Sequence, residues 1–251
     1  MQGDRHRVWS MVVTIFGDLA QNQGDELSAQ TLARLTEPMG IKSEALRVAL
    51  HRLRKDGWIE SKRIGRSRSY FLTPFGVQQS AEATPRIYGQ TDPQSLEWVL
   101  ATTPNQPAGI TSDWAFLDDD RRFVRLGAHS FLGERSGFSK SHRLLITSVG
   151  QDALPEWVKE TVIDPKLIVA YSALIKHLTQ LKTNFPAHVT AMERSVLRTL
   201  IVHSWRRIVL RHLDVPVGFY PKDCQALRCR DLVLELLDRL PRPTLADLTS
   251  A

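Results

Sequence analysis

A predicted helix at residues 43–56 constrains the fold of this chain most. Its apolar residues recur at the spacing i, i+3, i+4 and i+7, which places them on one buried face. These residues are Leu46, Ala49, Leu50 and Leu53. Ser43 is expected to cap the helix with its hydroxyl group, and Gly57 is expected to end it. The opposite face carries cationic side chains, so it lies in solvent or against an anionic partner.

A β-hairpin is predicted directly after this helix. Residues 58–63 and 68–72 read as two short strands, and Gly65 supplies the turn between them. Two helices are expected upstream, over residues 5–22 and from Ser28 to about Pro38. The order of helix, helix, short turn, helix and hairpin is typical of a winged helix-turn-helix domain.

The excess charge of the chain is concentrated in this helix and hairpin. Residues 42–68 hold nine Lys and Arg residues against three acidic ones, so their net charge equals the +6 of the whole chain of 251 residues. A basic helix beside a basic hairpin matches the major-groove helix and the cationic wing of a DNA-binding domain. The alternatives are a solvated basic face and a winged helix that contacts proteins.

Two further domains are expected downstream, which makes the chain an α+β multidomain protein. The N-terminal winged helix-turn-helix is assigned to residues 1–86, and residues 84–93 form a turn-rich linker. Residues 94–164 predict a small central α+β domain, and residues 165–251 predict a C-terminal helical bundle. In the central domain, strands are expected at 97–102, 128–132 and 144–149, and a helix at 118–126. Three long helices are expected in the bundle, at 166–183, 189–212 and 223–240.

The sequence lacks the signatures of catalytic, cofactor and metal sites. It contains no G-x-S-x-G, H-E-x-x-H, P-loop or G-x-G-x-x-G motif, so we predict no enzyme, no cofactor and no metal ligand. The two cysteines, Cys224 and Cys229, are interpreted as reduced thiols. No apolar run is long enough to span a bilayer and the start of the chain does not read as a secretory signal. A cytoplasmic protein without a membrane partner is therefore expected.

Two separated stretches resemble the PaaX family of bacterial transcriptional regulators, the phenylacetic acid degradation repressors. The first comprises ALRVALHRL at residues 45–53, followed by Asp56-Gly57-Trp58, Gly65-Arg66 and Tyr70 with Leu72-Thr73. The second comprises HSWRRI at residues 203–208, Leu210-Arg211, Pro216 and Pro221. The resemblance implies a homodimeric repressor that binds a palindromic operator in double-stranded DNA. It also implies a ferredoxin-like central domain, and release by a small effector such as an aryl-acyl-CoA thioester.

The candidate DNA contacts divide between the basic helix and the wing. Arg47 is best placed for a bidentate bond to guanine, because residues near the start of a recognition helix reach the bases. The other candidates on or before the helix are Lys42, Ser43, Glu44, His51, Arg52 and Arg54. The wing candidates, which we expect to contact the phosphate backbone, are Lys62, Arg63, Arg66 and Arg68.

The candidate effector site lies on one C-terminal helix. Trp205, Arg206, Arg207 and Arg211 follow one another along it, and Arg207 and Arg211 are four residues apart and share a face. Cationic side chains beside an aromatic ring suit the phosphates and acyl ring of a CoA ester. Alternatively, Trp205 lies in the core and the arginines pair with acidic residues of the last helix, such as Glu235 or Asp238.

A function of a different class is also compatible with the sequence. The chain could be a winged-helix adaptor whose basic hairpin binds an acidic protein or RNA, with no ligand. Binding to duplex DNA with a preference for particular sites separates this alternative from a transcriptional regulator.

Overall fold

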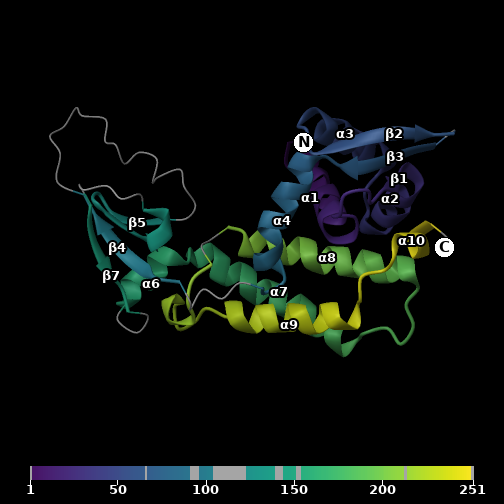
Figure 1. Cartoon of the computed structure of the whole chain (residues 1–251). Coiled ribbons are helices and arrows are strands. Elements are labelled where there is room, and N and C mark those ends of the chain that lie inside the picture. Colours follow the sequence, from purple (N-terminus) through teal and green to yellow (C-terminus); the bar gives the residue numbers. More distant parts are fainter. Residues whose placement is uncertain are drawn as a thin grey trace. The chain divides into compact units, whose positions relative to one another are not determined.

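The structure is a computed structural model of an α+β chain with two antiparallel sheets. It describes residues 2–65, 67–90, 96–103, 123–138, 144–150, 154–211 and 214–249 (Figure 1). The chain divides into two compact units: unit 1 is Met1–Gln90, Leu174–Arg207 and Arg228–Ala251, and unit 2 is Thr91–Ala173 and Ile208–Leu227. The assignment of three domains to 1–86, 94–164 and 165–251 stays a prediction.

The N-terminal part of unit 1 has the expected order of elements. These elements are α1 (Gln2–Leu19), β1 (Leu27–Ser28), α2 (Ala29–Thr36), a 3-10 turn (Glu37–Met39), α3 (Ser43–Lys55), β2 (Ile59–Ile64), β3 (Ser67–Leu72) and α4 (Pro74–Ile87). The three strands form an antiparallel sheet in the order β1-β3-β2. The apolar stripe of α1 and the inner faces of α2 and α3 form one buried core, which includes Phe16, Leu32 and Leu53. The periodicity in the sequence therefore identified this core correctly.

Two helix boundaries in this part differ from the prediction. Ser43 does not cap α3, because the N-cap position is Lys42 and Ser43 is the first residue of the helix. Helix α4 continues to Ile87, so the prediction of a linker from residue 84 is wrong for residues 84–87. Pro85 is tolerated near the end of α4, where it removes only one backbone donor, and Tyr88 still donates to the carbonyl of Thr84 over 3.0 Å.

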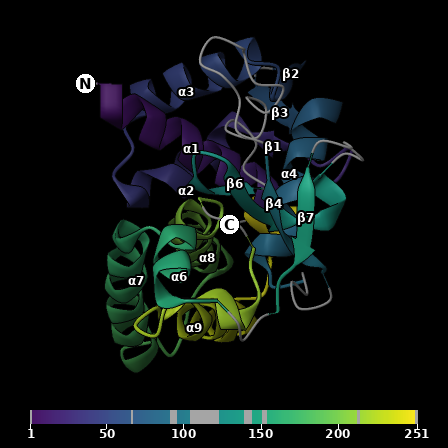
Figure 2. The ribbon, with the colours of Figure 1, turned by 90° about the vertical axis from the view of Figure 1, so that its left-hand side faces the viewer.

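The C-terminal helices are long and mostly as predicted. They are α7 (Pro165–Thr183), α8 (Ala191–Val209), α9 (Ala226–Arg239) and the short α10 (Leu245–Thr249). Figures 1 and 2 show α7, α8 and α9 side by side. Val196 of α8 and Leu248 of α10 belong to the same buried core as α1, α2 and α3. In unit 1, the C-terminal helices and the N-terminal elements are thus packed as one body.

Unit 2 contains the second sheet. Its strands are β4 (Trp98–Thr102), β5 (Phe123–Gly127), β6 (Ser130–Glu134) and β7 (Leu145–Ser148), in the antiparallel order β5-β6-β4-β7, and α6 is Glu156–Val162. The prediction of a helix at 118–126 is wrong for residues 123–126, and residues 118–122 lie outside the described residues. Phe123 is buried against Phe131 and Phe138, and β5 pairs with β6, so cross-strand packing determines the structure here.

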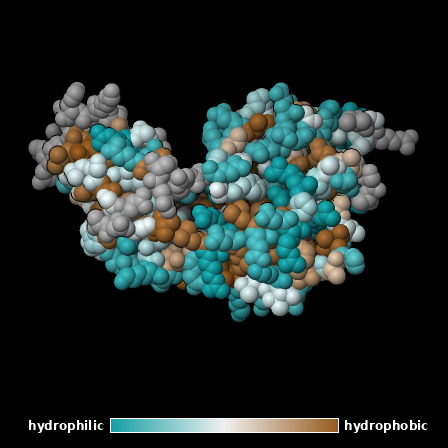
Figure 3. All heavy atoms as spheres, turned by 60° about the horizontal axis from the view of Figure 1, so that its bottom comes forward, coloured by the Kyte–Doolittle hydropathy of each residue, from teal (hydrophilic) through white to brown (hydrophobic). Residues whose placement is uncertain are grey.

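The described surface combines hydrophilic residues with small apolar groups. On the face drawn in Figure 3, hydrophobic residues appear as several separate groups among hydrophilic ones. Among the described residues, no helix is long and apolar enough to cross a membrane, and no group of three or more His, Cys, Asp and Glu residues could hold a metal ion. Neither Cys224 nor Cys229 forms a disulfide bond within the described residues.

Candidate nucleic-acid interface

Helix α3 is held by its apolar face and presents its polar face outward. Its inner residues, Leu46, Ala49, Leu50 and Leu53, are buried, and α1 packs against this helix. The exposed residues Glu44, Arg47, Val48 and His51 lie three and four positions apart, so they form one stripe on the opposite side. The amphipathic sequence thus fixes which side chains of α3 reach a partner.

The start of α3 is open to an anionic partner. Its N-cap residue, Lys42, makes no capping hydrogen bond with its side chain, and Lys42, Ser43 and Glu44 are exposed. The backbone N–H groups of a first helical turn have no partner within the helix, and the helix dipole makes this end electropositive. A phosphate group of a nucleic acid fits such a helix end, and Lys42 adds a full positive charge beside it.

The hairpin β2–β3 places like charges opposite each other. Arg63 and Arg68 are cross-strand partners in its register, and both are exposed. Gly65 makes the turn with a φ of 59°, a conformation that most side chains disfavour. Two like charges directly opposite each other on a hairpin are unfavourable without an anion between them. The hairpin therefore has the charge arrangement of a surface that meets phosphates.

The predicted contact residues differ in whether their side chains already form hydrogen bonds or ion pairs within the protein. Within the described part of the chain, Arg47, Arg54 and Arg68 make no side-chain hydrogen bond or ion pair. Others are engaged: Arg52 lies 3.5 Å from Asp56, Arg63 Nε donates to the carbonyl of Gly65 over 3.1 Å, and Lys62 forms an ion pair with Glu26. Arg66 lies outside the described residues. The residues with no internal partner are the ones most available to an external anionic partner.

Hydrogen bonds of Thr73 fix the hairpin relative to α3. The Thr73 hydroxyl donates to the carbonyl of Gly57 over 2.6 Å and accepts from the backbone N–H of Gly76 over 3.0 Å. The backbone N–H of Thr73 also donates to the carbonyl of Trp58 over 3.0 Å. Thr73 therefore caps α4 while it ties the end of the hairpin to the residues that follow α3. The Thr73-Pro74 pair in the sequence indicates a helix cap, but it does not indicate the hydrogen bond from Thr73 to Gly57.

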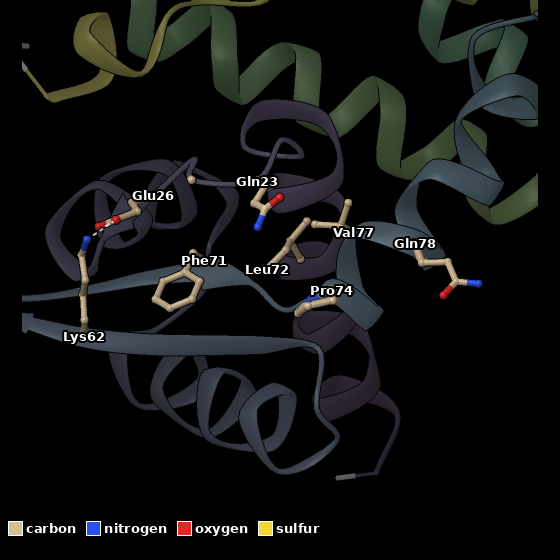
Figure 4. A pocket seen from close by; sticks show the side chains of 9 residues that line it. Gln23, Glu26, Lys62, Phe71, Leu72, Pro74, Val77 and Gln78 are labelled. Atoms are coloured by element: carbon tan, nitrogen blue, oxygen red, sulfur yellow. Dashed lines mark ion pairs between the residues drawn. The ribbon is translucent and has the colours of Figure 1, made fainter.

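A shallow pocket lies beside the hairpin. It has a volume of about 540 Å³ and its floor is apolar, with Phe71, Leu72 and Val77. Figure 4 shows Glu26 and Lys62 at its edge, with Gln23 and Gln78 as the polar side chains nearby. Because Lys62 is held by Glu26 at this edge, it is less available to a phosphate than the other wing cations.

The candidate effector residues are distributed between buried and exposed positions. Trp205 is buried and donates from Nε1 to the carbonyl of Ile87 over 2.8 Å, and Arg206 donates to the Thr14 hydroxyl over 3.2 Å. Burial lowers the pKa of Arg206. Arg207 is exposed on α8. The prediction that Arg207 and Arg211 share a helical face is wrong, because α8 ends at Val209 and Arg211 lies in the following turn.

The acidic partners proposed for these arginines also differ in the structure. Glu235 pairs with Lys182, at 2.6 Å. The buried arginine of α8 that forms an ion pair is Arg198, whose Nε lies 2.8 Å from a carboxylate oxygen of Asp18 in α1. Sequence reasoning missed this pair, because the two residues are 180 positions apart and neither lies in a recognisable motif.

Comparisons with known proteins agree with this description of the N-terminal part. Residues 7–76 match the sequence model of the family described as PaaX-like protein. A stretch of 92 residues is 34% identical to the transcriptional repressor PaaX of Escherichia coli (strain K12), and it covers 36% of this chain and 29% of that protein. Over residues 7–76 the chain is therefore similar to the PaaX family. Residues 7–76 include α3 and the hairpin, so all eleven predicted DNA contacts lie within the PaaX-like domain, and the candidate effector residues lie outside it.

The wider fold also has a counterpart among solved structures. An uncharacterized protein from Mycobacterium tuberculosis superposes with a TM-score of 0.50 over 89% of this chain and 90% of that one, at 17% sequence identity. At this identity the similarity shows a shared fold alone. The likeness to the E. coli repressor, in contrast, spans less than a third of that repressor's length.

Proposed function

We propose that this protein is a transcriptional regulator that binds specific sites in double-stranded DNA through an N-terminal winged helix-turn-helix. One observation carries the proposal: α3 displays Arg47 and His51 on an exposed face, beside a hairpin whose Arg63 and Arg68 oppose each other. An α-helix fits the major groove of B-DNA, and a cationic hairpin beside it reaches the phosphate backbone. The match to a repressor across this same region supports the assignment.

The contacts are proposed to divide between sequence reading and positioning. Glu44, Arg47 and His51 face the bases, because they lie on the exposed stripe of α3. Lys42, Arg54 and Arg68 contact phosphates, because they lie before α3, in its last turn and on the hairpin, and make no internal ion pair within the described part of the chain. Arg52 and Lys62 must first leave Asp56 and Glu26, so we expect them to contribute less.

The finer parts of the proposal extend the family resemblance. We propose a homodimeric repressor that binds a palindromic operator and is released by a small effector such as an aryl-acyl-CoA thioester. Arg207 and Arg211 are exposed and remain candidates for the effector site, whereas the burial of Trp205 favours its structural role. The order of the second sheet, with the hairpin β5–β6 beside a central β4, supports a ferredoxin-like central domain.

Binding of the full-length protein to the DNA directly upstream of its own coding region tests this function. We expect tight binding that weakens with salt, with log K falling by about 0.9 per phosphate neutralised in a plot against log[salt]. A panel of aryl-acyl-CoA thioesters, added to the complex, tests the effector. Binding to that DNA that is no tighter than to an unrelated duplex contradicts the proposal. Preferential binding to RNA or to an acidic protein in the same assay favours the adaptor alternative.

A further inference from the structure

Val48 is an exposed apolar residue in the middle of the proposed DNA-reading face. Its exposed fraction is 52%, and it lies in the second turn of α3 between Arg47 and His51 on the same stripe. At least one other exposed apolar residue has a visible structural reason. Phe75, for example, stacks edge-on against Trp58, with ring centroids 5.6 Å apart. The neighbours of Val48 along the exposed stripe are Glu44, Arg47 and His51, which are charged or polar, so apolar packing within this stripe does not explain it.

Helix stability does not explain Val48 either. A β-branched side chain loses rotamer freedom in a helix, so at an exposed position Val is a poorer helix former than Ala, Lys or Glu. The same stiffness is an advantage for recognition, because one rotamer dominates and the two methyl groups point in a fixed direction. Val48 therefore presents a rigid apolar surface from the part of α3 that we propose to enter the groove.

Among the base edges of the major groove, thymine alone offers a methyl group. The other edges display hydrogen-bond donors and acceptors, which suit Arg47, His51 and Glu44 on the same stripe. A side chain without polar atoms gains affinity there only from thymine, and at a guanine or adenine edge it leaves polar atoms without partners. The chemistry of Val48 is thus complementary to one base.

We propose that Val48 determines specificity by packing against the C5-methyl group of a thymine in the operator. This inference rests on the proposed function and adds the base that one residue selects. Arg47 and Val48 are adjacent on α3, so this thymine lies within about two base pairs of the guanine that Arg47 contacts.

Replacement of thymidine by deoxyuridine tests the inference, because it removes only the methyl group. Duplexes are first selected from a random-sequence pool with the full-length protein, and each thymidine in the enriched site is then replaced in turn. We expect one position in each half-site at which the wild-type protein loses affinity about fourfold. Val48→Ala should bind the thymidine site about fourfold more weakly, with no further loss on the deoxyuridine site. Val169→Ala, at another exposed apolar position, should keep the wild-type response.

The outcomes separate this inference from the proposed function. If the selection enriches a site but no deoxyuridine replacement weakens wild-type binding, the thymine contact is wrong and the regulator stands. If Val48→Ala remains sensitive to the methyl group, another residue makes the contact and the inference is likewise wrong. If no duplex is enriched over the starting pool, both the function and the inference are overturned.

Discussion

Arg198 of α8 holds both carboxylate oxygens of Asp18 in α1. Its Nε donates to Oδ2 over 2.8 Å, and its Nη2 donates to Oδ1 over 2.9 Å. Its Nη1 donates to the carbonyl of Leu240 over 2.8 Å. Both side chains are buried. The guanidinium group thus ties the first helix of the PaaX-like domain to α8 and to the end of α9.

We expect Asp18→Asn to lower the free energy of unfolding by about 3–5 kcal/mol, because it leaves the charge of Arg198 buried without its counterion. Denaturant unfolding of the full chain measures the change. Lys182→Ala is the control, since it breaks the exposed pair with Glu235 and should cost no more than about 1 kcal/mol. Equal losses in the two variants would show that the buried pair has no special role.

Tyr88 makes the same cluster sensitive to alkaline pH. Its hydroxyl donates to Asp18, and its pKa is raised above the ordinary value of 10.0, first by burial and then by the Asp18 carboxylate. The stabilisation from a raised pKa of this kind is complete below pH 10 and is lost as the pH rises above it. The stability difference between the wild type and Tyr88→Phe should therefore shrink above pH 10. A difference that is constant with pH would contradict this.

Gly76 and Gly17 should respond to Ala in opposite directions. A Cβ at Gly76 would lie 2.3 Å from the carbonyl oxygen of Trp58, so Gly76→Ala must displace the backbone at Trp58 or at Gly76. It should lower the free energy of unfolding by about 1–3 kcal/mol. A Cβ at Gly17 would meet only Ser80, at 3.5 Å, and Gly17→Ala should stabilise α1 by up to about 1 kcal/mol. Thermal unfolding of both variants measures the contrast.

Arg47 and Arg68 should affect DNA binding in different ways. Arg47→Ala should reduce discrimination between the selected site and unrelated duplexes by about 1–3 kcal/mol, because it removes a proposed base contact. Arg68→Ala should weaken binding to both DNAs alike and make the salt dependence shallower. Lys176→Ala, an exposed charge on α7, serves as the control. An equal loss on every duplex for both variants would contradict this division of roles.

Glu26→Gln should strengthen DNA binding without preference for sequence. The change releases Lys62 from its ion pair and removes one negative charge beside the hairpin. We expect the slope of log K against log[salt] to steepen by up to about 0.9, and the stability to change little because Lys62 is half exposed. Unchanged affinity and slope would mean that Lys62 does not approach a phosphate.

The basic surface was predictable because its determinants are local. The i, i+3, i+4 spacing of Leu46, Ala49 and Leu50 defines the buried face of α3, and therefore also the exposed one. The turn at Gly65 depends on a single residue with a positive φ. The same spacing places Val48 on this exposed face.

Other features depend on neighbours that are remote in the sequence. The run from Phe123 to Leu126 reads as a helix when judged by the acidic residues before it, yet it forms a strand because Phe123 packs on Phe131 and Phe138. The pairs Glu26–Lys62 and Asp18–Arg198 join distant segments, so no spacing rule indicates them. The pair Glu26–Lys62 engages one cation of the predicted set of DNA contacts.

The sequence by itself determined the helix and hairpin, their excess charge and the PaaX resemblance, because periodicity and composition act over a few neighbouring residues. Only the tertiary structure decided that Trp205 is buried against the backbone of Ile87 and that Arg198 is committed to Asp18. Burial and charge pairing are set by which elements pack together, and that packing brings together residues that are far apart along the chain.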